Sequence, residues 1–191
     1  MSILDKLLNK CEQDGVLKEE EEDIIRFGIE SLINLVICLG ILLCIGWIFG
    51  SLLSGTFFFA FFLPLRKFAG GYHSNTEVGC IISSIIILLL VFSTLFLGRW
   101  NIAVYLIISV LCNILFFFMV PVENKNKLLD KLEKEVYRKK TWKVLTYENL
   151  CVLFSYYMNL YFIIRITAMV YVTVGILLIW GRLDNLKMIG R

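Results

Sequence analysis

One short polar segment, residues 66–80, carries the residue types that perform covalent chemistry. It contains His73, the only histidine among 191 residues, and seven positions later Cys80. A thiolate is a nucleophile, and an imidazole within about 2.6–3.2 Å of it can take its proton. The segment lies between two strongly apolar runs. The pattern therefore predicts a Cys-His peptidase site at the face of a membrane.

Residues 74–77 match the capping box that starts many helices, directly ahead of an apolar run. The match predicts a helix start near residue 74, with Cys80 in the second helical turn. Backbone N–H groups at a helix start favour an ionised thiol and can stabilise an oxyanion. Seven residues of straight helix would separate the two side chains by about 10 Å. His73 must therefore lie in the preceding turn and fold back.

Four residues at the start of the segment are expected to support the pair. Arg66 and Lys67 bring positive charge from the other side of a bend at Gly70 and Gly71. Two glycines permit a tight turn or the close approach of a substrate backbone. We therefore expect these four residues, together with Glu77, to position substrate or stabilise an oxyanion.

Each candidate residue also has an ordinary structural alternative. A lone His73 at a membrane interface can be a hydrated surface residue, and Cys80 can be a packing residue like the chain's five other cysteines. Arg66 and Lys67 can serve only as a topology anchor. Glu77 fits a helix cap better than a third catalytic residue. The residue types alone leave both readings open.

The composition predicts an all-α, polytopic membrane protein. Apolar residues make up 59% of the chain, against roughly 45–50% in soluble domains, and the mean hydropathy is +0.79. About 20 apolar residues cross a bilayer as a helix. We expect one integral membrane domain, residues 1–191, with about six transmembrane helices at residues 32–49, 52–65, 78–97, 102–120, 145–164 and 166–180. The second span is short enough to be tilted or re-entrant.

Basic residues orient these spans. If the N-terminus is cytoplasmic, 17 of the 19 Lys and Arg residues fall on the cytoplasmic side, and only Arg99 and Arg165 do not. Cytoplasmic loops are enriched in such residues. We therefore expect a multi-pass protein whose two termini and segment 66–80 face the cytoplasm.

The first 30 residues are predicted to form a cytoplasmic amphipathic segment that contacts membrane lipid. Apolar residues recur there at helical spacing, at Ile3, Leu4, Leu7, Leu8 and Cys11. A short helix packed against the protein's own loops is the alternative. Acidic residues crowd positions 19–23, so the segment does not resemble a signal peptide.

The segment from Arg66 through Gly70, Gly71 and His73 to Cys80 resembles the signature of the accessory gene regulator B (AgrB) family. These are bacterial cell-membrane peptidases of quorum sensing. The resemblance implies a cysteine endopeptidase that removes the C-terminal tail of a small AgrD-like precursor peptide and cyclises it to a thiolactone or lactone. It implies that Cys80 is the nucleophile and His73 the general base, and that Arg66 and Gly71 are needed for activity.

The family's precursors have an amphipathic leader and an acidic tail, which suggests a docking site in the basic cytoplasmic loop expected at residues 123–143. Its cations outnumber its acidic residues by five over residues 125–143. The candidates for docking are Lys125, Lys127, Lys131, Lys134, Arg138, Lys139 and Lys140. A basic helix resting on anionic lipid is an equally good alternative, because Leu128, Leu132 and Val136 lie at helical spacing.

The main rival is a non-enzymatic peptide transporter or export accessory. Transporters usually carry polar residues at midspan, and only the fifth span has several, among them Glu148 and Asn159. A metalloprotease of the EExxxR type is discarded, although residues 21–26 match that string, because its site needs several histidines. We expect no metal, cofactor or nucleic-acid partner. A homodimer remains an open alternative.

Overall fold

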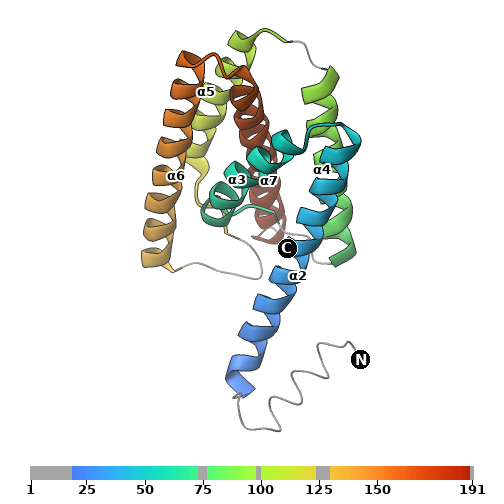
Figure 1. The fold of residues 1–191 in the computed structure, drawn as a ribbon. Helices are drawn as coiled ribbons and strands as arrows, with labels where there is room; N and C mark the ends of the chain where they lie inside the picture. The colour runs from blue at the N-terminus through green and yellow to red at the C-terminus, as the bar shows by residue number, and fades with distance from the viewer. Residues whose placement is uncertain (1–18, 73–76, 98–99, 124–129, 190–191) are drawn as a thin grey trace. The chain divides into compact units, whose positions relative to one another are not determined.

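The computed structural model in Figure 1 describes residues 19–72, 77–97, 100–123 and 130–189. Within these ranges the chain forms six helices and no strand longer than a single bridge, which confirms the all-α prediction. The helices are α2 (Glu19–Ile48), α3 (Leu52–Ala69), α4 (Glu77–Leu97), α5 (Ile102–Met119), α6 (Lys131–Tyr157) and α7 (Tyr161–Ile189). Most of the amphipathic segment predicted at the N-terminus lies outside the described residues.

The chain divides into two compact units, one ending at Ile41 and the other running from Leu42 to Arg191. The first unit contains the N-terminal part of α2, on which the described side chains Ile33, Val36 and Ile37 are exposed. The second unit contains the last turns of α2 and the other five helices. Residues 66–80 belong entirely to this second unit.

Helix α7 is the centre of the second unit. It packs against α3, α4, α5 and α6. Buried residues lie on several of its sides, as is typical of a helix enclosed by others. The most deeply buried are Ile164, Ile166, Ala168, Val170, Tyr171, Val174 and Leu178. Segments that are distant in sequence therefore meet on α7.

Within the described part of the chain, three helices are long and apolar enough to cross a membrane: α3, α5, and α7 over Tyr161–Leu186. Shorter apolar stretches occupy Val36–Ile48 in α2 and Ile81–Leu97 in α4. One face of α5 shows the preference for lipid directly, because it leaves large apolar side chains exposed that water would disfavour. These side chains, each more than half exposed, are Ile107, Val110, Leu111, Ile114 and Phe118.

Helix α3 is longer than the predicted second span. It continues past Leu65 through Arg66 and Lys67 and ends at Ala69. Arg and Lys are good helix formers, so a change from apolar to charged residues does not end a helix. With 18 residues, α3 is about 27 Å long, close to the thickness of the hydrocarbon core. The two cations therefore lie in its last turn, immediately before the two glycines.

The larger part of residues 123–143, expected as a basic cytoplasmic loop with apolar residues at helical spacing, is helical. From Lys131 the chain is helical, and α6 runs without interruption to Tyr157. Its start is stabilised by the Glu133 carboxylate, which accepts a hydrogen bond from the backbone N–H of Asp130 at 3.1 Å. The Lys, Glu and Arg residues of this stretch favour helix, although they are not apolar.

The predicted boundary between the last two spans is wrong. The chain turns at residues 158–160, where Asn159 adopts a φ of 58°, and α7 begins at Tyr161. Asparagine tolerates this left-handed conformation better than most residues. Apolar side chains continue on both sides of the turn, so hydropathy alone placed the boundary several residues too late.

A proline substitution tests whether the basic stretch is helical. Lys139 is exposed in the middle of the basic half of α6. Lys139→Pro should lower the free energy of unfolding by about 3 kcal/mol, because proline removes a helix hydrogen bond and clashes with the preceding turn. Thermal unfolding of the purified protein in detergent measures the change. Lys139→Ala is the matched control and should be nearly neutral; equal stability of the two variants would contradict a helix here.

Candidate functional site

The predicted reactive pair falls at a gap in the described chain. His73 and the cap residues 74–76 lie outside the described residues. Cys80 is described by its backbone alone, as the fourth residue of the described part of α4, which opens at Glu77. The placement of Cys80 close to the start of this helix agrees with the expected position. The contact between the two side chains stays a prediction.

Arg66 holds the backbone that leads to His73. From the last turn of α3, its Nη1 atom donates a hydrogen bond to the carbonyl oxygen of Gly70, and its Nη2 atom donates to that of Tyr72. A guanidinium presents its donors in a fixed planar fork, which suits two acceptors at once. Arg66 therefore determines the course of residues 70–72, here called the Gly-Gly segment.

Gly70 cannot be replaced by a larger residue without moving the backbone. Its φ of 76° lies in the region that favours glycine, and an added Cβ would collide with the carbonyl oxygen of Val122. Val122 follows α5 and forms a single parallel bridge with Gly70. The amide of Val122 donates to Ala69 at 3.0 Å, and the amide of Gly71 donates to Val122 at 3.1 Å.

Gly71 is confined between α3 and α7. Its φ is 109°, and an added Cβ would lie 2.7 Å from the Nη1 atom of Arg66 and 2.8 Å from the carbonyl oxygen of Leu177. That carbonyl accepts a hydrogen bond from the backbone N–H of Tyr72 at 2.8 Å. The second glycine is thus required by close backbone contact with α7.

One turn further along α7, the absence of a side chain at Gly181 leaves room for the backbone of residues 71 and 72. A Cβ at Gly181 would lie 2.6 Å from the backbone nitrogen of Tyr72 and 2.8 Å from the carbonyl carbon of Gly71. Beside it, the ring of Trp180 stacks on the ring of Tyr72, with centroids 4.9 Å apart. The residue immediately before His73 is therefore fixed by a hydrogen bond, by a ring stack and by Arg66.

Sequence reasoning missed this contribution of α7. Leu177 and Trp180 lie at the end of the predicted span 166–180, and Gly181 follows that span directly. One signal was present, because a glycine within an apolar helix often marks the close approach of another backbone. Nothing in the sequence indicates which segment approaches.

The basic half of α6 lies beside the end of α3. The Nζ atoms of Lys67 and Lys140 lie 5.8 Å and 5.3 Å from the centroid of the Phe68 ring. The rings of Phe68 and Tyr137 pack edge to face, with centroids 6.1 Å apart. These contacts place the cations of α6 close to the Gly-Gly segment. The described candidates for docking, all exposed, are Lys131, Lys134, Arg138, Lys139 and Lys140. Lys125 and Lys127 lie outside the described residues.

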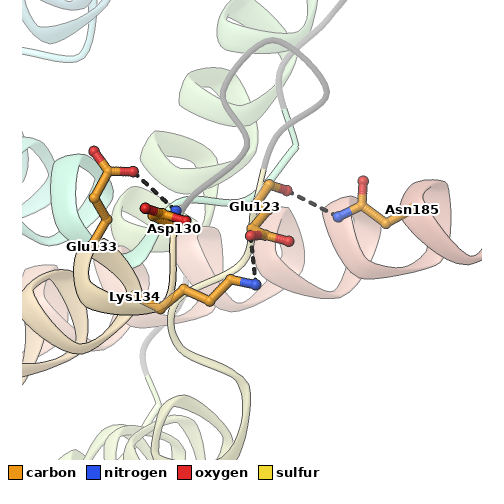
Figure 2. A network of polar contacts seen from close by, with 5 residues as sticks. All are labelled: Glu123, Asp130, Glu133, Lys134 and Asn185. Carbon is orange, nitrogen blue, oxygen red and sulfur yellow. Dashed lines mark hydrogen bonds and ion pairs between the residues drawn. The ribbon is translucent and has the colours of Figure 1, made fainter.

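Figure 2 shows that Lys134 already has a partner. Its Nζ atom lies 2.7 Å from the Oε1 atom of Glu123, whose backbone carbonyl accepts a hydrogen bond from the side chain of Asn185 at 3.0 Å. Glu123 therefore links α6 to α7 directly after Val122. The contact fixes the connection that lies against Gly70.

Substitution of Gly181 tests the close approach. Gly181→Ala should lower the free energy of unfolding by about 1–3 kcal/mol, because the new methyl group would meet backbone atoms that have no space to move into. Gly175→Ala is a matched control on the same helix, where the added Cβ has no neighbour closer than 3.8 Å. It should be neutral or stabilising by up to about 1 kcal/mol. Thermal unfolding in detergent compares them, and a stable Gly181→Ala variant would refute the contact.

Across the described residues no group of three or more His, Cys, Asp or Glu side chains could hold a metal ion. The described part of the site consists of backbone groups, glycines and the guanidinium of Arg66.

Comparison with known proteins identifies the same family as the resemblance of residues 66–80. The model of the family described as "Accessory gene regulator B" matches residues 3–181. A relative from Clostridium perfringens strain 13, provisionally named AgrB-like protein 2, is 29% identical over 152 residues, covering 75% of this chain and 69% of the relative. Another from strain SM101, provisionally named AgrB-like protein, is 31% identical over 153 residues, covering 75% and 71%. No solved structure matches the chain. The chain is a membrane protein that belongs to the accessory gene regulator B family.

Proposed function

We propose that this protein is a membrane cysteine endopeptidase that matures a small quorum-sensing precursor peptide. Family membership supports the setting of precursor processing. The observation that carries the proposal is the fixed Gly-Gly segment, in which Tyr72 is bonded to both Arg66 and Leu177. So rigid a backbone immediately before the only histidine is suited to aiming an imidazole at the start of α4.

The proposed reaction has two acyl-transfer steps. The Cys80 thiolate attacks the carbonyl carbon of one precursor peptide bond, and the C–N bond breaks as His73 gives a proton to the leaving amine. The precursor is then held as a thioester on Cys80, and its C-terminal tail departs. An internal thiol or hydroxyl of the peptide, losing its proton to His73, attacks the thioester. Cys80 leaves as a thiolate, and a thiolactone or lactone ring is closed.

The start of α4 favours this chemistry. The first N–H groups of a helix have no partner within the helix, so they can donate to a thiolate or to the oxyanion of the tetrahedral intermediate. Cys80 is within reach of these groups because its backbone lies near the described start of α4. Holding the precursor at one place makes ring closure an intramolecular step, which raises its effective concentration.

The basic half of α6 is proposed to bind the acidic tail of an AgrD-like precursor. Lys140 and Lys67 flank Phe68, which is two residues from Gly70. The exposed cations of α6 therefore extend a positive surface away from the site. Lys134 contributes least, because Glu123 already neutralises it. The distribution of Lys and Arg supports a cytoplasmic position for this surface, the site and both termini.

Removal of the nucleophile tests the enzymatic step. Cys80→Ala should abolish release of the precursor tail when the two proteins are produced together, and the covalent precursor adduct seen by mass spectrometry should disappear with it. Cys44→Ala, which changes an exposed thiol in α2, should leave cleavage unchanged. Normal cleavage by Cys80→Ala would reject the peptidase and favour a carrier of peptides processed elsewhere.

Two lysine variants test the docking surface. Lys140→Gln should raise KM for a precursor with an acidic tail about 2–5-fold, the effect of one exposed charge pair worth about 0.5–1 kcal/mol, and should leave kcat unchanged. Lys134→Gln is the matched control, because it removes the same charge from a side chain that Glu123 already neutralises. A precursor whose tail acids are replaced by amides should abolish the difference. Equal effects of both variants on both precursors would indicate lipid binding instead.

A further inference from the structure

Three helices meet at a polar centre that the proposed peptidase chemistry does not use. Asn113 of α5 and Asn149 of α6 exchange hydrogen bonds between their amide groups at 2.9 and 3.3 Å. The hydroxyl of Tyr171 in α7 donates to the Oδ1 atom of Asn149 at 3.4 Å. Asn113 donates in addition to the backbone carbonyl of Ser109 at 2.8 Å. Apolar residues surround this centre, with Phe116 packed edge-on against Tyr171.

Glu148 is the member of this centre that lacks a partner. Its side chain is 3% exposed, and neither carboxylate oxygen has a hydrogen-bond partner of ordinary geometry. The Tyr171 hydroxyl interacts with the carboxylate and also lies 3.4 Å from the Oδ1 atom of Asn149, but it carries no positive charge. An ionised carboxylate buried without a hydrogen bond or counter-ion costs several kcal/mol. The carboxyl group therefore needs a positive charge of its own.

No described cationic side chain supplies that charge. The guanidinium of Arg165 lies over the ring of Tyr105, 5.9 Å from its centroid, and is six residues or about 9 Å along α7 from Tyr171. The only charged residues of α3 are Arg66 and Lys67, in its last turn. This end of α3 lies beside Lys140, and Lys140 is about 12 Å along α6 from Glu148. The two cations of α3 are therefore far from the carboxylate.

The remaining polar side chains near the centre contain no cationic group. They are the phenol of Tyr171 and the thiol of Cys151, while α5 presents the amide of Asn113. No side chain among them can compensate a carboxylate. The geometry thus leaves a small ligand as the source of the positive charge.

We infer that Glu148 binds a proton and forms, with Tyr171, Asn149 and Asn113, a proton-binding site inside the helical bundle. The neutral acid has an O–H group that can donate to the oxygen of Tyr171. Tyr171 donates to Asn149, Asn149 to Asn113, and Asn113 to the carbonyl of Ser109. Protonation thus gives the buried carboxyl group a hydrogen-bond partner and removes its uncompensated charge. Buried ionisable residues of membrane proteins commonly serve as such proton sites.

A carbodiimide experiment tests the inference without any precursor peptide, so its outcome is independent of the proposed peptidase. Dicyclohexylcarbodiimide is apolar and adds to protonated carboxyl groups. In membranes containing the full chain at neutral pH, peptide mass spectrometry should find the acylurea on Glu148. Labelling should fall by tenfold or more as the pH is raised and the proton is lost. Glu148→Gln should show no adduct at this position, and its helical content should match that of the parent protein.

Three results would overturn the assignment. One is absence of the adduct on Glu148 across the pH range, while a water-soluble carbodiimide modifies the exposed Glu133 of the same sample. A second is labelling of Glu148 no faster than labelling of Glu133 by the apolar reagent. The third is protection by sodium ions but not by N-methylglucamine, which would assign the site to a metal cation instead of a proton.

Discussion

The structure depends on a contact between two backbones. Residues 71 and 72 lie so close to α7 that no Cβ fits at Gly71 or at Gly181. The carbonyl of Leu177, which in a regular helix accepts the amide of Gly181, also accepts the amide of Tyr72. Shared acceptors of this kind are common in proteins, but they require close approach. The geometry of the segment before His73 follows from this contact.

Helix α7 contacts both the Gly-Gly segment and the polar centre around Glu148. Leu177 touches the Gly-Gly segment, and Tyr171 belongs to the polar centre around Glu148. Six residues of helix separate them, about 9 Å along the axis. Since α7 is enclosed by four other helices, it is a rigid element. Protonation inside the bundle and the position of the segment before His73 are thus connected by one stiff structure.

Part of this fold was predictable from local patterns. The bounds of α5 and the end of α4 agree with the predicted spans to within one residue, because Asn101 and Pro121 coincide with changes in hydropathy at the two ends of α5. Helix α6 was divided into a loop and a span because charged residues interrupt the apolar pattern without interrupting the helix. The turn at Asn159 went unnoticed for the opposite reason, since a conformational break occurs inside an apolar run.

The candidate site was likewise predictable only in part. Arg66 and the glycines could be singled out from their types, but the expected role of Arg66 was to supply charge, whereas the structure shows it also bonded to two backbone carbonyls. The segment that Leu177 and Gly181 contact could not be identified, because the contact joins segments about 100 residues apart in sequence. Such a contact produces no periodic pattern in the sequence.

The four-residue interval between Leu177 and Gly181 has a consequence for how the chain can change in length. The interval is close to one helical turn. The carbonyl oxygen of Leu177 and the side of Gly181 that lacks a Cβ therefore both face the backbone of residues 71 and 72. One residue inserted between them would rotate Gly181 by about 100° and present a different side chain to Tyr72. Substitutions elsewhere on α7 keep this alignment, but insertions and deletions within that turn do not.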